Sequence, residues 1–500
     1  MGDLKTIRPE LLTFSQEQIQ VLLPYFYVFA GTVVAVLASV VKSINPKWLV
    51  FLISILTCIA GICSAWNFLD QPSVLLFNGM MVVDSYSNFF NIVFLGSALI
   101  TLLASFRYLD KEKLQYPEYY VLILFSALGM MLMASSLDLI VIFIALELMS
   151  LAVYVLVGFR RADRRSNEAA MKYFILGSVA SAVFLYGTAL LYGSTGHIGM
   201  REIGSFAHAH PASVTPIFIL GAGFVLFGFL FKVASVPFHM WMPDVYEGAP
   251  VPVTGFMTTG LKAAAFATFI RVFISLYGSP ISLFLEGHIH NILWVSAVLT
   301  MVVGNFVALT QTNLKRMLAY SSIAHSGYLL IGVLSGSRSD LGFTPGVFYI
   351  VAYAAMNLGA FVILTLLSGR EDSGLNLHDL SGISRRQPWL AFSMSVFLFS
   401  MAGIPPTAGF VAKYMLFYSA IQANELVLVL IAVLCSAVSV YYYLRVLVYM
   451  YMRDPVGSPP ASRVSMWSGL AVAAMVAITL EMGILPAQML SLAKKVLTQL

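Results

Sequence analysis

Long apolar runs, separated by short polar connections, make up most of the chain. Fourteen of these runs are long enough to cross about 30 Å of hydrocarbon as helices. Transmembrane helices are predicted at residues 21–41, 47–67, 86–106, 119–136, 138–159, 169–193, 215–249, 250–276, 291–310, 318–335, 344–368, 389–420, 426–452 and 465–490. Membrane β-strands would give segments of about 10 residues in which apolar and polar positions alternate, and the observed runs are longer. Backbone polar groups in lipid must be hydrogen-bonded within each segment, as they are in a helix. An all-α polytopic membrane protein is therefore expected.

The composition agrees with this prediction. Of the 500 residues, 59% are hydrophobic and only 10% are charged, and the mean hydropathy is +0.87. Soluble domains contain about 25% charged residues. The polar segment at 1–20 lacks a basic start and a small-residue cleavage site, so no signal peptide is expected. Insertion would then depend on the transmembrane helices themselves.

The positions of lysine and arginine predict the orientation. Most of the 28 cationic residues lie in connections that follow odd-numbered helices, and such residues collect on the cytoplasmic side. Both termini are therefore expected on the opposite side. The net charge of +5 arises in these loops, and no basic stretch is interleaved with aromatic residues as a nucleic-acid site would require. No nucleic-acid partner is expected.

The sequence contains no motif for a cofactor or a metal. Cys58, Cys63 and Cys435 lie in apolar runs without CxxC or Cys/His ligand spacing, which favours small buried hydrophobic side chains. The sequence also lacks a Walker loop, GxGxxG after a strand, HExxH and GxSxG. A catalytic centre within this chain is not expected.

Two predicted helices are too long to be continuous. The runs at 215–249 and 389–420 would each extend about 50 Å at the helical rise per residue. FKVASVPF at 231–238 matches FSMAGIPP at 399–406 in its Phe, Ala and Pro. Proline removes a backbone donor and clashes with the preceding turn, which leaves carbonyls free for water or ions. Helix breaks are predicted at Pro237, Pro405 and Pro406.

The matching breaks also suggest an inverted repeat. They lie in the seventh and twelfth helices, and an odd separation of five helices places the two copies in opposite orientations. We predict an N-terminal part at 1–118, five-helix repeats at 119–276 and 291–452, and a C-terminal helix within 465–500. Two coincidental proline kinks are the alternative.

Ionisable residues inside the predicted helices are the candidates for function, because they are costly in lipid. The sequence places four of them near mid-membrane depth: Glu147, Lys232, Lys262 and Lys413. Burial favours neutral lysine, whereas a nearby carboxylate favours the charged form, so a movable glutamate could load or unload a proton. A proton relay is therefore predicted. His325, in the tenth helix, could join it or be a structural core histidine.

Structural alternatives exist for these residues. Glu147 and Lys232 could form a static buried pair that fixes helix register. Arg271 and Arg445 lie nearer helix ends, which favours a structural role or snorkelling to the lipid interface. A purely structural role is harder to assign to the other two lysines, because the sequence suggests no acidic partner for them.

Three segments carry a family resemblance. They are FKVASVPFHMWMPDVYEGAPVPVTGFM at 231–257, LKRMLAYSSIAHSGY at 314–328 and AGIPPTAGFVAKY at 402–414. They resemble the proton-translocating, antiporter-like membrane subunits of respiratory complex I (NADH-quinone oxidoreductase), over about residues 80–452. The chain length, the fourteen predicted helices and Lys413 are most similar to the subunit N branch of this family.

The resemblance implies roles for the candidate residues. It pairs Glu147 with Lys232, makes Lys262 the link between two half-channels, and assigns the terminal relay step to Lys413. His325 matches the tenth-helix region of the family. The implied function is proton translocation coupled to NADH:quinone electron transfer elsewhere in the complex.

The resemblance also implies a setting for the chain. Flavin and iron–sulfur clusters would belong to partner subunits, and subunits K and M would be neighbours of this chain. It would lie in a bacterial inner membrane with both termini in the periplasm. Two alternatives remain: a subunit of a multisubunit sodium/proton antiporter, which shares the motifs, and a membrane scaffold without a transport role.

Overall fold

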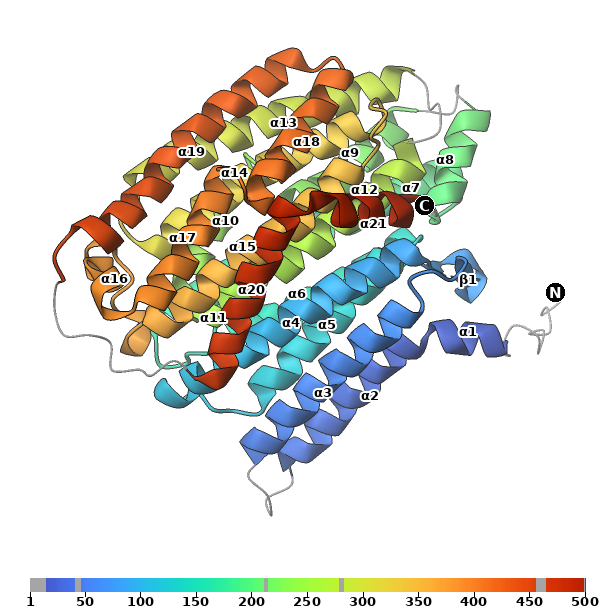
Figure 1. Cartoon of the computed structure of the whole chain (residues 1–500). Coiled ribbons are helices and arrows are strands. Elements are labelled where there is room, and N and C mark those ends of the chain that lie inside the picture. Colours follow the sequence, from blue (N-terminus) through green and yellow to red (C-terminus); the bar gives the residue numbers. More distant parts are fainter. Residues whose placement is uncertain (1–14, 41–45, 211–214, 278–282, 456–464, 499) are drawn as a thin grey trace.

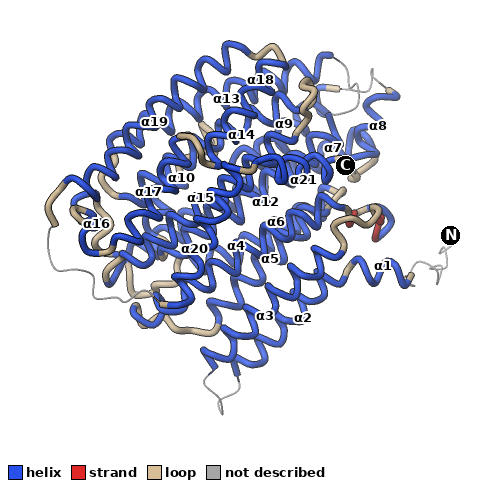
Figure 2. The backbone as a smooth tube through the Cα atoms, in the orientation of Figure 1, coloured by secondary structure: helices blue, strands red, loops and turns tan. Residues whose placement is uncertain are grey.

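A computed structural model describes residues 15–40, 46–210, 215–277, 283–455, 465–498 and 500. Within these ranges, twelve helices are long and apolar enough to cross a membrane. Two shorter apolar helices, α9 (Pro216–Lys232) and α17 (Pro388–Ala402), lie where the two long helices were predicted to break. The prediction of an all-α membrane fold with two broken helices is confirmed (Figure 2).

The N-terminal part contains three long helices and one small hairpin. Its elements are α1 (Gln16–Val21), α2 (Leu23–Val40), α3 (Pro46–Asn67), β1 (Val74–Leu76), η2 (Phe77–Gly79), β2 (Met81–Val83) and α4 (Ser85–Lys111). The hairpin pairs Val74 with Val83 in antiparallel register. It was not predicted, because strands of three residues are too short for a period-two pattern to appear. The start of the predicted polar segment, 1–14, lies outside the described residues.

The central part of the chain carries the first broken helix. Its elements are α5 (Glu118–Ser135), α6 (Leu139–Val157), α7 (Arg164–Thr195), α8 (Met200–Ala209), α9, α10 (Trp241–Gly248), α11 (Val251–Phe256), η4 (Met257–Leu261) and α12 (Lys262–Tyr277). Helix α7 begins five residues before the predicted 169, because the Asp163 carboxylate caps it by accepting from the Arg165 N–H at 2.9 Å.

The rest of the chain carries the second broken helix. Its elements are α13 (Leu283–Thr310), α14 (Leu314–Gly336), α15 (Thr344–Leu367), η5 (Arg370–Asp372), η6 (Leu377–Leu380), α16 (Ile383–Arg386), α17, α18 (Ala408–Gln422), α19 (Leu426–Met452), α20 (Met466–Ile484) and α21 (Pro486–Leu497). The predicted end of the last helix at 490 is wrong. Helix α20 ends at Ile484, and Pro486 starts a separate helix because proline cannot continue the preceding one.

The middle of the molecule is formed by helices that hardly reach the surface. The spans at 251–275, α14 and α15 are almost wholly buried within the protein. Helix α20 crosses the molecule beside α15 and α4, and so connects the last part of the chain to the N-terminal part (Figure 1). Side chains on the central helices are therefore shielded from lipid by the surrounding ones.

Candidate proton-relay site

Glu147 lies in the middle of α6, where its carboxylate is only partly buried. The helix begins where the Asp138 carboxylate accepts from the N–H groups of Ile140 and Val141, at 2.8 and 3.2 Å. Glu147 accepts a hydrogen bond from the Ser181 hydroxyl of α7. A neutral hydroxyl is therefore its partner in this structure.

Lys232 is the last residue of α9, directly before the first break. Its side chain is buried, and its Nζ donates to Ser150 Oγ of α6 at 2.6 Å and to the Tyr173 hydroxyl of α7 at 3.5 Å. Among the described ion pairs, none joins Lys232 to Glu147. The direct pair that the resemblance implied is thus not formed here.

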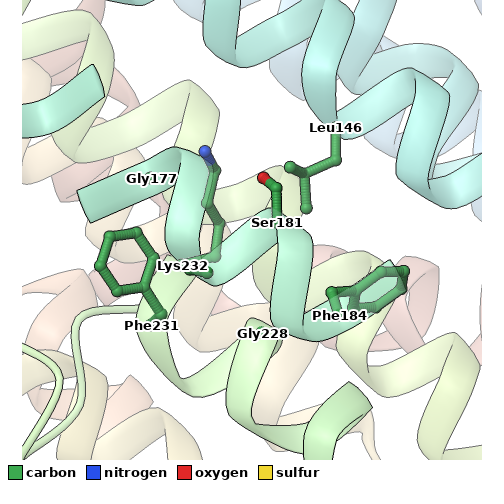
Figure 3. A pocket seen from close by; sticks show the side chains of 8 residues that line it. Leu146, Gly177, Ser181, Phe184, Gly228, Phe231 and Lys232 are labelled. Atoms are coloured by element: carbon green, nitrogen blue, oxygen red, sulfur yellow. The ribbon is translucent and has the colours of Figure 1, made fainter. Parts of the chain in front are cut away.

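A small pocket lies between α6, α7 and α9 (Figure 3). Lys232 and Ser181 both line it, and the other lining residues are the glycines Gly177 and Gly228 and the apolar side chains of Leu146, Ala180, Phe184 and Phe231. Its free volume is about 10 Å³, close to the space that one water molecule needs. The lysine on one wall and the serine that binds Glu147 on another therefore share one small space.

The break after Lys232 is filled by side chains of neighbouring helices. The peptide bond before Pro237 is cis, and the Val236 N–H donates to Thr300 Oγ1 at 2.9 Å. The Val233 carbonyl accepts from Ser326 Oγ at 2.7 Å. The prediction that these backbone groups are left free for water or ions is therefore wrong for this carbonyl, because a hydroxyl occupies it.

Lys262 opens α12, directly after the π-helical segment η4. Such segments often mark functional positions in a helix. The buried Nζ donates to the Ser322 carbonyl at 2.6 Å and to Ser322 Oγ at 2.5 Å, and it lies 5.6 Å from the centre of the Tyr353 ring. Lys262 is therefore held by α14 and α15.

His325 lies one turn beyond Ser322 on α14 and is buried. Its Nδ1 is 2.7 Å from the Tyr349 hydroxyl and its Nε2 is 3.3 Å from the Tyr443 hydroxyl. Its ring also packs 4.8 Å, centre to centre, from Tyr353, the ring beneath Lys262. His325 is thus next to the Lys262 site, with hydroxyl partners on both nitrogens.

Lys413 lies in α18, just after the second break. Its buried Nζ donates to the carbonyls of Met401 and Ala402 at 2.9 and 3.1 Å, and to Ser436 Oγ at 2.9 Å. These carbonyls are at the end of α17, where the chain turns into the cis Pro405–Pro406 bond. At this break too, carbonyls released by the helix end are occupied by a side chain, here the amine of Lys413, and are not left free for water or ions.

Hydroxyl and aromatic side chains connect the three lysine sites. Ser326 Oγ donates to the Val233 carbonyl, next to Lys232, and lies 3.2 Å from the Ser322 carbonyl that binds Lys262. On the other side, Tyr328 contacts His325 with its ring and lies 5.3 Å from Lys413 Nζ. Residues of α14 therefore lie next to the surroundings of all three lysines.

Two other intramembrane cations have different surroundings. Arg271 forms two hydrogen bonds with the Asp84 carboxylate, at 2.8 and 2.9 Å, and both side chains are buried. Snorkelling to lipid is therefore wrong for Arg271. Arg445 donates to the carbonyls of Leu309, at 2.9 Å, and Gln311. Both arginines connect helices to each other.

Sequence reasoning missed the partners of the relay residues. Ser150, Ser181, Ser322 and Ser436 contact relay residues here, and tyrosines from three helices, α7, α14 and α15, contact the lysines. The only local signal was spacing, because Ser322 and Ser326 lie four residues apart on one face of a helix. Among the described residues, no group of three His, Cys, Asp or Glu could hold a metal ion.

Comparisons with known proteins identify the family. The family described as NADH:quinone oxidoreductase/Mrp antiporter, TM, matches residues 136–439. Subunit N of NADH-quinone oxidoreductase from Trichlorobacter lovleyi is 45% identical over 420 residues, which cover 84% of this chain and 85% of the relative. Subunit N 1 from Solibacter usitatus is 40% identical over 93% of this chain and 94% of its own length.

Solved structures agree with these relatives. A chain of respiratory complex I from Thermus thermophilus is 33% identical, with a TM-score of 0.79 over 94% of this chain and 99% of that chain. A chain of the Mrp complex from Dietzia has a TM-score of 0.81 over 96% and 97%, but at 21% identity it shows the fold alone. The chain belongs to the subunit N family and is an antiporter-like membrane subunit of NADH-quinone oxidoreductase, respiratory complex I.

Proposed function

We propose that this chain translocates protons through Glu147, Lys232, Lys262, His325 and Lys413, driven by NADH:quinone electron transfer elsewhere in complex I. The observation that carries the proposal is a difference between buried cations. Lys232, Lys262 and Lys413 bind hydroxyl and carbonyl groups, and none of the three forms an ion pair within the described part of the chain. A buried lysine without a bound carboxylate can exchange its proton.

Two buried arginines in the same protein have the opposite surroundings. Arg271 is paired with Asp84, and Arg160 with Asp372 at 2.7 Å. Arginine stays protonated at any physiological pH, so such pairs are suited to holding helices together. The lysine positions are the ones where a change of charge is chemically accessible. This contrast favours transport over a scaffold role.

The contacts between the relay residues suggest a path for the proton. A carboxylate near Lys232 favours the ammonium form, and its withdrawal favours release of the proton. Ser326 and Ser322 connect the Lys232 region with Lys262, and His325 with its tyrosine partners lies between Lys262 and Lys413. Water or hydroxyl rotation would complete the transfers between these groups.

The proposal includes the setting of the chain. Subunits K and M are its neighbours, flavin and iron–sulfur clusters reside in other subunits, and both termini face the periplasm of a bacterial inner membrane. Residues 119–276 and 291–452 act as two inverted repeats, each with one broken helix. High identity to subunit N relatives supports this setting over a sodium/proton antiporter.

The test is a reconstituted complex that contains Lys262→Ala. NADH-driven quinone reduction and the transmembrane pH gradient are measured together in proteoliposomes. We expect normal assembly and a proton yield per NADH reduced to a minor fraction of the wild-type value. Lys494→Ala, an exposed lysine in α21, is the matched control.

The outcomes separate the candidate functions. An unchanged proton yield in Lys262→Ala would contradict the relay. Loss of the assembled complex, with a normal yield from the remaining fraction, would support a structural role. Sodium-dependent proton exchange by an assembly without flavin or iron–sulfur absorbance would instead support the antiporter alternative.

A further inference from the structure

Two stripes of polar or small residues face each other across α6 and α7. On α6 the stripe has residues at i, i+3 and i+7, a spacing that places them on one face. On α7 the residues are spaced by four. The α6 stripe is Glu147, Ser150 and Tyr154, and the α7 stripe is Tyr173, Gly177 and Ser181. Lys232 enters this interface from the end of α9.

Hydroxyl groups keep the two charges of this interface apart. Ser181 donates to the Glu147 carboxylate, and Ser150 accepts from Lys232 Nζ at 2.6 Å. Ser150 is three residues after Glu147 on the same helix, so the two sites are about 4.5 Å apart along its axis. A shift of one helical turn would bring the amine to the carboxylate.

The pocket beside Lys232 supplies space for that shift. Figure 3 shows the side chains of Lys232 and Ser181 at this pocket, with Gly177 on α7 among the lining residues. Lysine has four rotatable side-chain bonds, so its amine can move by one turn while its backbone stays in place. The narrow volume of about 10 Å³ fits an amine or a water molecule and little else.

Tyr154 offers an additional polar group on the same face. Its hydroxyl is buried and has no hydrogen-bond partner among the described residues. A Cβ at Gly177 would lie 2.1 Å from this oxygen, so only glycine at 177 leaves room for it. Because buried hydroxyls are normally bonded, this one is available to a group that moves along the stripe.

We propose that Ser181 is a positioning residue of the relay: by holding Glu147, it sets the balance between the two positions of Lys232 that the proposed function requires. In the first position, described here, Lys232 binds Ser150 and Tyr173 while Ser181 binds Glu147. In the second, Glu147 releases Ser181 and binds the Lys232 ammonium. This inference rests on the proposed proton-transfer function and adds Ser181 and Ser150 to it as positioning residues.

The energetic effect of each serine is large enough to matter. Hydrogen bonds to charged groups are among the stronger ones in proteins, and losing one would shift the balance between the two positions by roughly tenfold or more. Without the Ser181 hydroxyl, Glu147 would stay with Lys232. The pair would then resist separation, and the lysine would release its proton less often.

The experiment uses the assembled complex in proteoliposomes, with NADH oxidation and proton uptake measured together. Ser181→Ala is expected to lower the proton yield per NADH severalfold, and Ser181→Thr, which keeps the hydroxyl, should restore most of it. Ser150→Ala removes the other hydroxyl and should act in the same direction. Ser178→Ala, an exposed serine one turn away on α7, is the control and should match the wild type.

A double variant separates positioning from packing. If Ser181 acts through Glu147, Ser181→Ala added to Glu147→Gln should lower the proton yield no further than Glu147→Gln alone. Additive losses, or no rescue by threonine, would overturn the inference. Normal pumping by Ser181→Ala, while Glu147→Gln and Lys232→Ala remain defective, would overturn it without affecting the proposed function; normal pumping by all three would reject both.

Discussion

At the scale of single residues, the buried cations of this protein fall into two groups. Lys232, Lys262 and Lys413 bind neutral oxygen atoms, whereas Arg271 binds a carboxylate with two hydrogen bonds. An ion pair removed from solvent gives little net stability, but one partner left alone is strongly destabilising. The Arg271–Asp84 ion pair should therefore hold α12 and α4 together and take no part in proton transfer.

The contribution of the Arg271–Asp84 ion pair to stability can be tested without measuring activity. Asp84→Leu should destabilise the protein by about 3–5 kcal/mol, because it leaves the Arg271 charge buried without a partner. The double variant Asp84→Leu with Arg271→Met should be clearly less destabilised, since no charge remains. The measurement is the apparent Tm of the solubilised complex. A double variant less stable than the single one would contradict the assignment.

The sequence was sufficient to identify the charged residues, and insufficient to identify their partners. Glu147 and the three lysines stood out because charge is rare in apolar helices. Ser150 and Ser181 did not stand out, because serine is common in transmembrane helices and bonds to its own backbone there. Which helix faces which serine depends on tertiary packing that no local pattern encodes.

At the scale of elements, the relay depends on how closely α7 and α9 approach each other. Gly187 of α7 faces the backbone of α9, where a Cβ would lie 2.8 Å from the Gly221 carbonyl and 2.8 Å from the Val225 nitrogen. Small residues allow such close approach between membrane helices. This contact fixes the distance between Ser181 on α7 and Lys232 on α9.

A methyl group at this contact should push the two helices apart. Gly187→Ala is expected to cost about 1–3 kcal/mol, as overpacking does, and to lower the proton yield because it displaces Ser181 from the Lys232 pocket. Gly193→Ala lies on the same helix with open space around its added carbon, and should be silent. Equal Tm and equal yield for both variants would show that the helix spacing is not critical.

The existence of the helices was predicted better than the residues at which they begin and end. All fourteen apolar runs correspond to helices, and the two long runs break where the proline pattern indicated. The π-helical segment before Lys262 and the hairpin at 74–83 were not foreseen. Both depend on backbone hydrogen bonds of only a few residues, which leave no hydrophobic periodicity in the sequence.

At the scale of the whole molecule, a buried charge network joins distant parts of the chain. Asp372 of η5 binds Arg160 at 2.7 Å, Lys315 at 3.2 Å and the Tyr108 hydroxyl at 2.8 Å. These partners follow α6, open α14 and end α4, respectively. The network therefore ties the predicted first and second repeats together at one end of the helix bundle.

The backbone of η5 indicates how firmly this network is held. Glu371 and Asp372 have φ values of 56° and 53°, in the left-handed region that is unfavourable for non-glycine residues. The Glu371 N–H donates to the Glu112 carboxylate at 2.9 Å, which helps to hold this conformation. The interactions of Asp372 thus outweigh a local conformational cost.

Protonation of Asp372 gives the network a defined dependence on pH. Burial by itself raises the pKa of the Asp372 carboxyl, but attraction to Lys315 and Arg160 and hydrogen bonds from Arg160 and Tyr108 outweigh it, so the pKa lies below its ordinary value. A lowered pKa in the folded state adds stability above the unfolded-state pKa of about 3.9. That stability is lost as the pH falls through the folded-state pKa.

Asp372→Asn should therefore lower the apparent Tm of the complex by the same amount at every pH between about 5 and 8, where aspartate is ionised in both states. The loss should be about 3 kcal/mol or more, because two buried cations lose their shared anion. Asp110→Asn, an exposed position at the end of the same helix as Tyr108, provides the control and should change little. A difference that disappears near pH 6 would mean that Asp372 is already protonated there, and that Arg160 and Lys315 are held by other groups. A constant difference would show that the network keeps its charges over this pH range and connects the two halves permanently. The helices would then stay in place while the lysines of the membrane interior change their charge.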